Sequence, residues 1–100
     1  MYKFNGFTEK ANRALNLAIE KAETMGHTYI GSEHLLLGIL AEGTGAAATL
    51  LASEGITEEK VAELLAEKVG EGLPTSLSPD DFTPRSKRIL EMSIAAARSI

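Results

Sequence analysis

The chain of 100 residues contains no cysteine and no tryptophan, and only 5% of its residues are aromatic. Without cysteine it has no disulfide, thiolate zinc site or thiol nucleophile, which fits a reducing compartment. No apolar run approaches the roughly 18–20 residues that a membrane helix needs, and the amino terminus lacks the apolar stretch of a signal peptide. The formal net charge of -4 offers no basic surface to nucleic acid or anionic lipid. We therefore expect a cytoplasmic protein with no nucleic-acid and no membrane partner.

Helices bounded by capping residues and glycines account for most of the sequence. Apolar residues recur every three or four positions between Thr8, a predicted N-cap, and Gly26, a predicted stop. The same signals predict three further helices within residues 32–43, 44–55 and 57–69, which begin at the caps Ser32, Thr44 and Thr57. No segment alternates with period two, so the predicted fold class is all-α.

These later helices differ in how much apolar surface they carry. Residues 35–40 are apolar on nearly every face, so the helix at 32–43 is expected at the centre of the core. The next two helices each present one apolar face. Their expected buried positions are Ala47, Leu50 and Leu51 in one helix and Val61, Leu64, Leu65 and Val69 in the other.

The end of the chain repeats its first helix. Phe-Thr at residues 82–83 follows Phe-Thr at residues 7–8 with an offset of 75, and the apolar stripe transfers in register. Identical residues occupy the pairs 7/82, 8/83, 13/88, 15/90, 19/94 and 22/97. The expected organisation is a four-helix repeat at 1–70, a linker rich in Gly, Pro and Ser at 71–81, and the first helix of a truncated second repeat at 82–100. The stripe of this last helix is expected to pack on the first repeat, pack on another copy, or fray; it contains Ile89, Leu90, Ile94 and Ile100.

No motif for catalysis, metal or cofactor binding is present in these residues. His27 and His34 match no metal-ligand spacing, and we expect an ordinary loop histidine and a partly buried helix histidine. The Gly-rich stretch GEGLPTS lacks the lysine of a phosphate-binding loop, and no serine lies in a nucleophile elbow. A helix-turn-helix DNA reader is disfavoured because the helix at 44–55 offers no basic or amide side chain to a base edge. We therefore expect a binding domain without a cofactor or a metal.

Glu33 follows the predicted cap Ser32 and has two possible roles. An acid in the first turn stabilises a helix through the helix dipole by roughly a few tenths of a kcal/mol. Alternatively, its carboxylate lies beside Thr8, where an N-cap hydroxyl and free amide groups hold an anion. A carboxylate beside an anion site would suit a ligand that carries both a guanidinium and a phosphate. The sequence leaves both roles open.

Residues 26–47, GHTYIGSEHLLLGILAEGTGAA, resemble the signature of the Clp N-terminal domain, GHxYIGTEHILLGLxxEGEGxA. The helix entries FTEKA and FTPRSK and the 75-residue period resemble the ClpC branch, so the resemblance covers almost the whole chain. Ser32 stands where threonine is usual, and AEGTG replaces the commoner REGEG; neither change removes Glu33.

The resemblance implies a helical bundle of two four-helix repeats related by a pseudo-twofold axis. Such domains dock substrates, and adaptors of the MecA or McsB kind, for an ATP-driven unfoldase that hands chains to ClpP. No Walker motif is present here, so the resemblance implies a binding module and not an enzyme. The alternative is a free-standing Clp-repeat protein that acts as a regulator or adaptor without an ATPase.

In the ClpC branch each repeat can bind phosphoarginine, a degradation tag. The resemblance assigns the guanidinium contact to Glu33, the phosphate-side threonine to Thr8, and a retained hydroxyl to Ser32. In the second repeat the corresponding threonine is Thr83, whose acidic partner would lie beyond residue 100, so this second site is expected to be half present. More weakly, the surface that cyclic peptide antibiotics occupy in the family would include Phe82 and Lys87.

Overall fold

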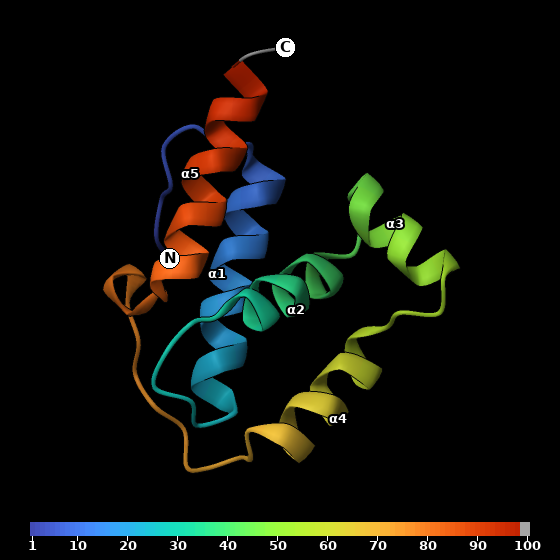
Figure 1. Cartoon of the computed structure of the whole chain (residues 1–100), viewed down its shortest axis with the longest axis vertical. Helices are drawn as coiled ribbons and strands as arrows, with labels where there is room; N and C mark the ends of the chain where they lie inside the picture. Colours follow the sequence, from blue (N-terminus) through green and yellow to red (C-terminus); the bar gives the residue numbers. More distant parts are fainter. Residues whose placement is uncertain (99–100) are drawn as a thin grey trace.

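A computed structural model describes residues 1–98 of the chain, and in this part the architecture is helical (Figure 1). The elements, in chain order, are α1 (Glu9–Thr24), α2 (Ser32–Glu42), α3 (Ala46–Ser53), α4 (Glu58–Lys68), the 3₁₀ turn η1 (Pro79–Asp81) and α5 (Pro84–Arg98). The predicted all-α fold class is confirmed. No single described helix is long and apolar enough to cross a membrane, although α2 and α3 together pass that test as a pair bent by 95°.

Two of the predicted helix caps act as expected. The Thr8 hydroxyl accepts a hydrogen bond from the Ala11 N–H at 3.2 Å, and the Thr57 hydroxyl accepts one from the Lys60 N–H at 3.3 Å. Each bond satisfies an amide of the first helical turn that has no acceptor within its helix. The starts of α1 and α4 therefore follow from local sequence.

The predicted caps of the other two helices were wrong by one residue. Ser32 is the first residue of α2, and Gly31 occupies the N-cap position. Likewise Gly45, and not Thr44, precedes α3. Thr44 turns back to Glu42 instead, because its hydroxyl and its amide both donate to that carboxylate, at 2.6 and 3.1 Å. These bonds lower the pKa of Glu42.

The crossing of α1 and α2 forms the centre of the fold, as predicted for α2 (Figure 1). Gly38 lies at this crossing, and a Cβ there would lie 2.9 Å from the backbone nitrogen of Ala18 and against the carbonyl oxygen of Ala14. The close approach of the two backbones therefore requires glycine. The main core cluster contains Leu15, Ala18, Ile19, Ala22, Ile30, Leu35, Leu77 and Phe82.

The helices α3 and α4 are less buried than predicted. Leu50 and Leu64 are 63% and 54% exposed, and Ala47 and Val69 also lie at the surface. In α3 only Ala48 is buried, and in α4 only Leu65 is buried; Leu65 packs with Met25 and Leu37. Both helices contact the fold chiefly through α2, so each covers only a narrow part of its apolar face. Periodicity indicates which face is apolar but not how much of it a partner covers.

The segment 71–81, predicted as a linker, is bound along its length to the end of α1. The Thr75 N–H donates to the Glu23 carbonyl oxygen at 3.0 Å, and the Leu77 N–H donates to the Glu23 carboxylate at 2.8 Å. The Thr75 hydroxyl donates to the His27 carbonyl oxygen at 2.6 Å. Leu77 itself belongs to the core cluster, so this segment is a packed connection with a fixed path.

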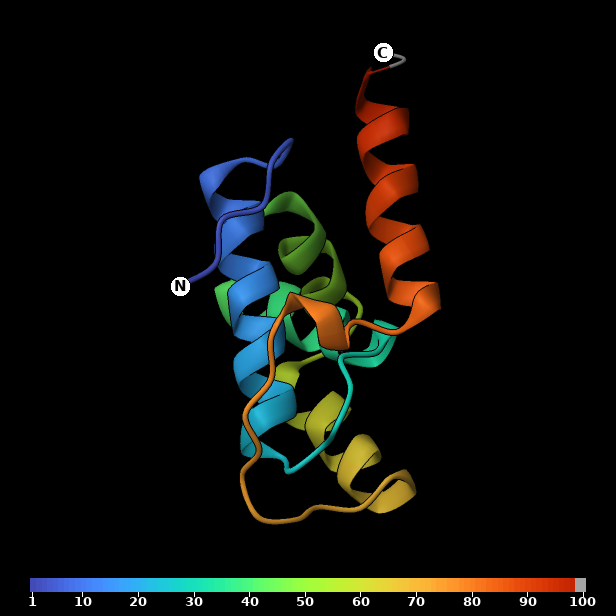
Figure 2. The ribbon, with the colours of Figure 1, turned by 90° about the vertical axis from the view of Figure 1, so that its left-hand side faces the viewer.

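The last helix, α5, packs only partly on the first repeat and projects beyond the rest of the fold (Figure 2). Leu90 packs against the core cluster, and the side chain of Ile94 lies close to Gly6. Ile89 remains 42% exposed at an apolar pocket of about 240 Å³ between α1, α2 and α5. Of the three predicted outcomes for this stripe, the described residues therefore fit partial packing on the first repeat; Ile100 lies outside them.

The helix crossing yields a testable prediction. The substitution Gly38→Ala should lower the free energy of unfolding by about 1–3 kcal/mol, because the added methyl group forces the two backbones apart. Chemical denaturation measures this change. Gly72→Ala is the matched control, since its Cβ meets no atom closer than 3.6 Å; it should change stability by less than about 0.5 kcal/mol. Equal effects of both substitutions would contradict the tight crossing.

Candidate functional site

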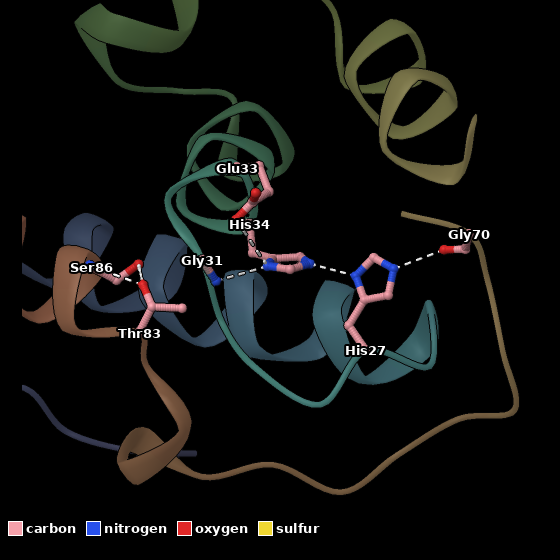
Figure 3. A network of polar contacts seen from close by, with 7 residues as sticks. All are labelled: His27, Gly31, Glu33, His34, Gly70, Thr83 and Ser86. Atoms are coloured by element: carbon pink, nitrogen blue, oxygen red, sulfur yellow. Dashed lines mark hydrogen bonds and ion pairs between the residues drawn. The ribbon is translucent and has the colours of Figure 1, made fainter. Parts of the chain in front are cut away.

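One isolated parallel bridge, between Ile30 and Phe82, places the candidate site. The Ile30 N–H donates to the Asp81 carbonyl oxygen at 2.8 Å, and the Thr83 N–H donates to the Ile30 carbonyl oxygen at 3.0 Å. Ile30 is fully buried and Phe82 is 5% exposed. Because α2 and α5 each begin two residues after the bridge, their amino termini lie side by side (Figures 2 and 3).

A pocket of about 210 Å³ opens between these two helix starts. Its lining consists of Tyr29, Gly31, Ser32, Glu33, Thr83 and Arg85. Both helix dipoles direct their positive ends to this region, and the first amide groups of each helix have no acceptor within the helix. Arg85 adds a positive charge and Glu33 a negative one. The pocket therefore suits a small ligand that carries both a cationic and an anionic group.

The carboxylate of Glu33 has room in this pocket because residue 31 is glycine. A Cβ on Gly31 would coincide with the carboxylate of Glu33 and would lie 3.2 Å from the Tyr29 ring. The Glu33 side chain is 37% exposed, so a ligand can reach it. Burial and the negative charge of Glu33 both raise the pKa of the Tyr29 phenol.

Thr83 caps α5. Its hydroxyl oxygen accepts the Ser86 N–H at 3.1 Å, and the hydroxyl donates to the Ser86 side-chain oxygen at 3.0 Å (Figure 3). Ser86 is fully buried, so these contacts fix the orientation of Thr83 at the edge of the pocket. An anion bound there would compete with Ser86 for the hydroxyl proton.

The structure does not bring Thr8 to Glu33, in contrast to the sequence hypothesis. Thr8 lines a separate pocket of about 320 Å³ together with Lys10 and Glu42, at the junction of α1 with α2 and α3. The threonine that lines the Glu33 pocket is Thr83, from the predicted second repeat. The two predicted ligand-binding threonines therefore belong to different sites, and a role for Thr8 in ligand binding stays a prediction for its own pocket.

The two residues predicted for the antibiotic surface have different environments. The Phe82 ring is buried in the core and lies edge-to-face against Phe4, with ring centroids 6.0 Å apart. Lys87 is exposed on α5. Their shared role stays a prediction, and Phe82 contributes little accessible surface in this structure.

Behind the pocket, two histidines form a buried chain of hydrogen bonds (Figure 3). The Gly31 N–H lies 2.9 Å from His34 Nδ1, His34 Nε2 lies 2.7 Å from His27 Nδ1, and His27 Nε2 lies 2.9 Å from the Gly70 carbonyl oxygen. The Gly31 amide can only donate, so His34 Nδ1 carries no proton, and His34 Nε2 donates to His27. His27 in turn donates to Gly70. This direction of donors requires both rings to be neutral.

The environment of His34 agrees with that assignment. Its side chain is fully buried, and burial lowers its pKa from 6.5 to about 4, although the Glu33 carboxylate acts in the opposite direction. His27 lowers this pKa further. His34 was predicted to be partly buried and His27 to be an ordinary loop residue; both are instead buried structural groups. No cluster of three metal-ligating side chains occurs within residues 1–98.

The histidine chain also stabilises the start of α2, where glycine offers no side-chain cap. His34 is the third residue of α2, and it accepts the N–H of the N-cap residue in the way that Glu or Gln does in a capping box. The sequence signal was therefore a histidine three residues after Gly31, the observed N-cap. It was missed because Ser32, and not Gly31, was taken as the cap.

Comparisons with known proteins agree on one family. The profile described as "Clp repeat (R) N-terminal domain" matches residues 6–100. The chain is 41% identical over 97 residues to chaperone protein ClpC1, chloroplastic, from Oryza sativa subsp. japonica, and 48% identical over 96 residues to the ATP-dependent Clp protease ATP-binding subunit ClpA homolog from Cyanidium caldarium. These matches cover 97% and 95% of this chain but only 11% of each relative.

A solved structure shares the fold. The N-terminal domain of the caseinolytic protease associated chaperone ClpD from Arabidopsis thaliana matches with a TM-score of 0.74 and 28% sequence identity. The match covers 98% of this chain and 68% of that one. The helical arrangement described above is therefore similar to that of a known chaperone domain.

The lowered pKa of the buried His34 predicts a loss of stability in mild acid. Because the folded-state pKa of His34 lies below 6.5, the unfolded chain binds the proton first as the pH falls, and stability decreases from about pH 6.5 toward pH 4. Urea denaturation should give a free energy of unfolding about 2 kcal/mol lower at pH 5 than at pH 7. His34→Gln keeps an acceptor for the Gly31 amide but does not titrate, so most of this difference should vanish. An unchanged pH dependence in that variant would contradict the account.

Proposed function

Because the chain belongs to the family of Clp repeat N-terminal domains, we propose that it docks substrate and adaptor proteins for a ClpC-type ATP-dependent unfoldase. Its partners would be the ATPase domains of that unfoldase and, through them, ClpP. Adaptors of the MecA or McsB kind are the class that the ClpC branch suggests. The expected location is the cytoplasm or the chloroplast, the compartment given in the name of the rice relative.

We further propose that the pocket between α2 and α5 binds phosphoarginine on substrate proteins. The observation that supports this is the meeting of Glu33 with two helix amino termini at one opening. A carboxylate pairs with a guanidinium through charge-assisted hydrogen bonds, whereas a phosphate favours helix amide groups, a hydroxyl and a cation. In this proposal Glu33 binds the guanidinium, while Ser32, Thr83 and Arg85 surround the phosphate.

This assignment makes the site a joint product of both repeats. The acid comes from the first repeat and the threonine from the second, which are linked by the bridge between Ile30 and Phe82. The bound group would bury little surface, so recognition depends on charge and geometry more than on area. Ligand-dependent docking of a tagged substrate therefore requires both helix starts in place.

Titration with free phosphoarginine tests the proposed site. Amide resonances near Ser32 and Thr83 should shift, and Glu33→Ala should weaken binding about ten- to hundredfold, since a hydrogen bond to a charged group contributes roughly 1.5–3 kcal/mol. Thr83→Val should also weaken binding, whereas Thr8→Val is the matched control and should leave the affinity unchanged. Absence of any shift at millimolar ligand, or equal losses from both threonine substitutions, would overturn the proposal.

A glycine substitution tests the position of the Glu33 carboxylate. The backbone of Gly31 has φ -92 and ψ 178, which alanine adopts without strain, but the added methyl group would displace the carboxylate. Gly31→Ala should therefore weaken phosphoarginine binding about tenfold while changing stability by less than about 1 kcal/mol. Isothermal titration and thermal melting measure the two effects.

The control is Gly45→Ala, the same substitution at the N-cap of α3, where the nearest atom is 3.9 Å away. It should leave the affinity unchanged. If Gly31→Ala binds phosphoarginine as well as the natural chain, the ligand does not depend on the observed carboxylate position.

A further inference from the structure

The amino-terminal segment, residues 1–5, runs along α1 (Figure 2). Two asparagine side chains of α1 hold it there. The Tyr2 N–H donates to the Asn16 carboxamide oxygen at 2.8 Å, and the Asn16 carboxamide nitrogen donates to the Tyr2 carbonyl oxygen at 2.8 Å. Asn12 makes the same pair of bonds with Phe4, at 2.6 and 3.2 Å. Each carboxamide thus satisfies both backbone groups of one residue.

This arrangement imitates the edge of a β-sheet. Residues two apart in an extended chain are separated by about 6.6–6.8 Å, and residues four apart in a helix are separated by about 6 Å along its axis. Two asparagines one turn apart therefore match alternate residues of an extended segment. A carboxamide has one acceptor side and one donor side, as a peptide group does. The asparagines therefore bind the backbone of the extended segment and not its side chains.

The asparagines are oriented by α1 itself, and not only by the segment. The Asn16 nitrogen also donates to the Asn12 carbonyl oxygen at 2.9 Å, and the Asn12 nitrogen also donates to the Thr8 carbonyl oxygen at 3.1 Å. These bonds fix which side of each carboxamide donates. In a flipped carboxamide, the side-chain oxygen would lie against the backbone carbonyl oxygen of α1. The receptor for an extended chain would therefore persist if the segment left.

Pockets lie along both sides of the segment, and its own residues form part of their lining. The Tyr2 hydroxyl donates to the Leu77 carbonyl oxygen at 3.4 Å, and the Phe4 ring packs on Phe82. Lys3, between them, is exposed. The flanking pockets measure about 430 Å³ and about 330 Å³. An occupant with large apolar or aromatic residues at alternate positions fits this surface.

The segment itself is suited to exchange. Residues 1–4 lie outside regular secondary structure, and Met1 and Tyr2 are 97% and 42% exposed. Ordering such a segment costs conformational entropy that offsets most of what its few hydrogen bonds contribute. A second extended chain with the same alternation can therefore compete for the same groups.

We propose that Asn12 and Asn16 form a docking groove for an extended stretch of a substrate polypeptide, and that residues 1–5 occupy the groove as an exchangeable plug. The partner is an unfolded segment with aromatic or large apolar residues at alternate positions. The choice of a substrate polypeptide as the partner rests on the proposed docking function. The groove itself does not. The groove shares no lining residue with the Glu33 pocket, so a substitution of Glu33 leaves the groove lining intact.

The test opens the groove in the full chain with Tyr2→Pro and Phe4→Pro, which remove the two donated N–H groups and leave both asparagines in place. Two fluorescent peptides serve as probes: one with the sequence of residues 1–5, and one unrelated pentapeptide with aromatic residues at its second and fourth positions. Both should bind the opened variant at least tenfold more tightly than the natural chain. Adding Asn12→Leu and Asn16→Leu should abolish this gain.

The matched control uses peptides that carry N-methyl groups at both aromatic residues, and it needs no change in the protein. These peptides lack the N–H groups that donate to the asparagines, so they should not bind. Glu33→Ala should leave peptide binding unchanged, so failure of the phosphoarginine site would not affect this result. Failure of both peptides to bind would overturn the groove, and so would equal binding of the N-methylated peptides. If only the peptide with the sequence of residues 1–5 binds, the groove is specific for the protein's own segment. That result would overturn a substrate role.

Discussion

The parallel bridge between Ile30 and Phe82 is the interaction on which the candidate site depends. Its two hydrogen bonds join segments about fifty residues apart, and both bridge residues are buried. The bridge forms because the segment 71–81 is bound to the end of α1 and delivers Phe82 to the core. With the bridge in place, the amino termini of α2 and α5 converge, and Glu33 and Thr83 line one pocket. The chemistry of the pocket thus follows from a tertiary contact and not from either helix alone.

The start of α2 combines two further constraints. Gly31 leaves space for the Glu33 carboxylate, and His34 supplies the cap that a glycine cannot. The donor direction along His34, His27 and Gly70 links the pocket to the end of α4, a helix in which only Leu65 is buried. A neutral, buried histidine pair therefore stabilises the start of α2, where Glu33 is the proposed ligand-binding carboxylate.

Local signals in the sequence predicted the helices, two of four early caps and the central place of α2. They succeeded because capping and periodicity act over a few residues. The partner of Glu33 was assigned to Thr8 because both lie in one repeat, whereas the structure pairs acid and threonine across the repeats. The exposure of Leu50 and Leu64, the fixed path of residues 71–81 and the histidine chain could not be predicted either. Each depends on contacts between segments far apart in the chain.

The central claim is that a ligand bound at Glu33 lies beside a threonine of the second repeat. An isotope-filtered NOE experiment on the phosphoarginine complex measures this proximity directly. The account predicts NOEs from the side-chain methylene groups of the ligand to the Gly31 Hα protons and the Thr83 methyl group, and none to the Thr8 methyl group. NOEs to Thr8 without any to Thr83 would contradict it.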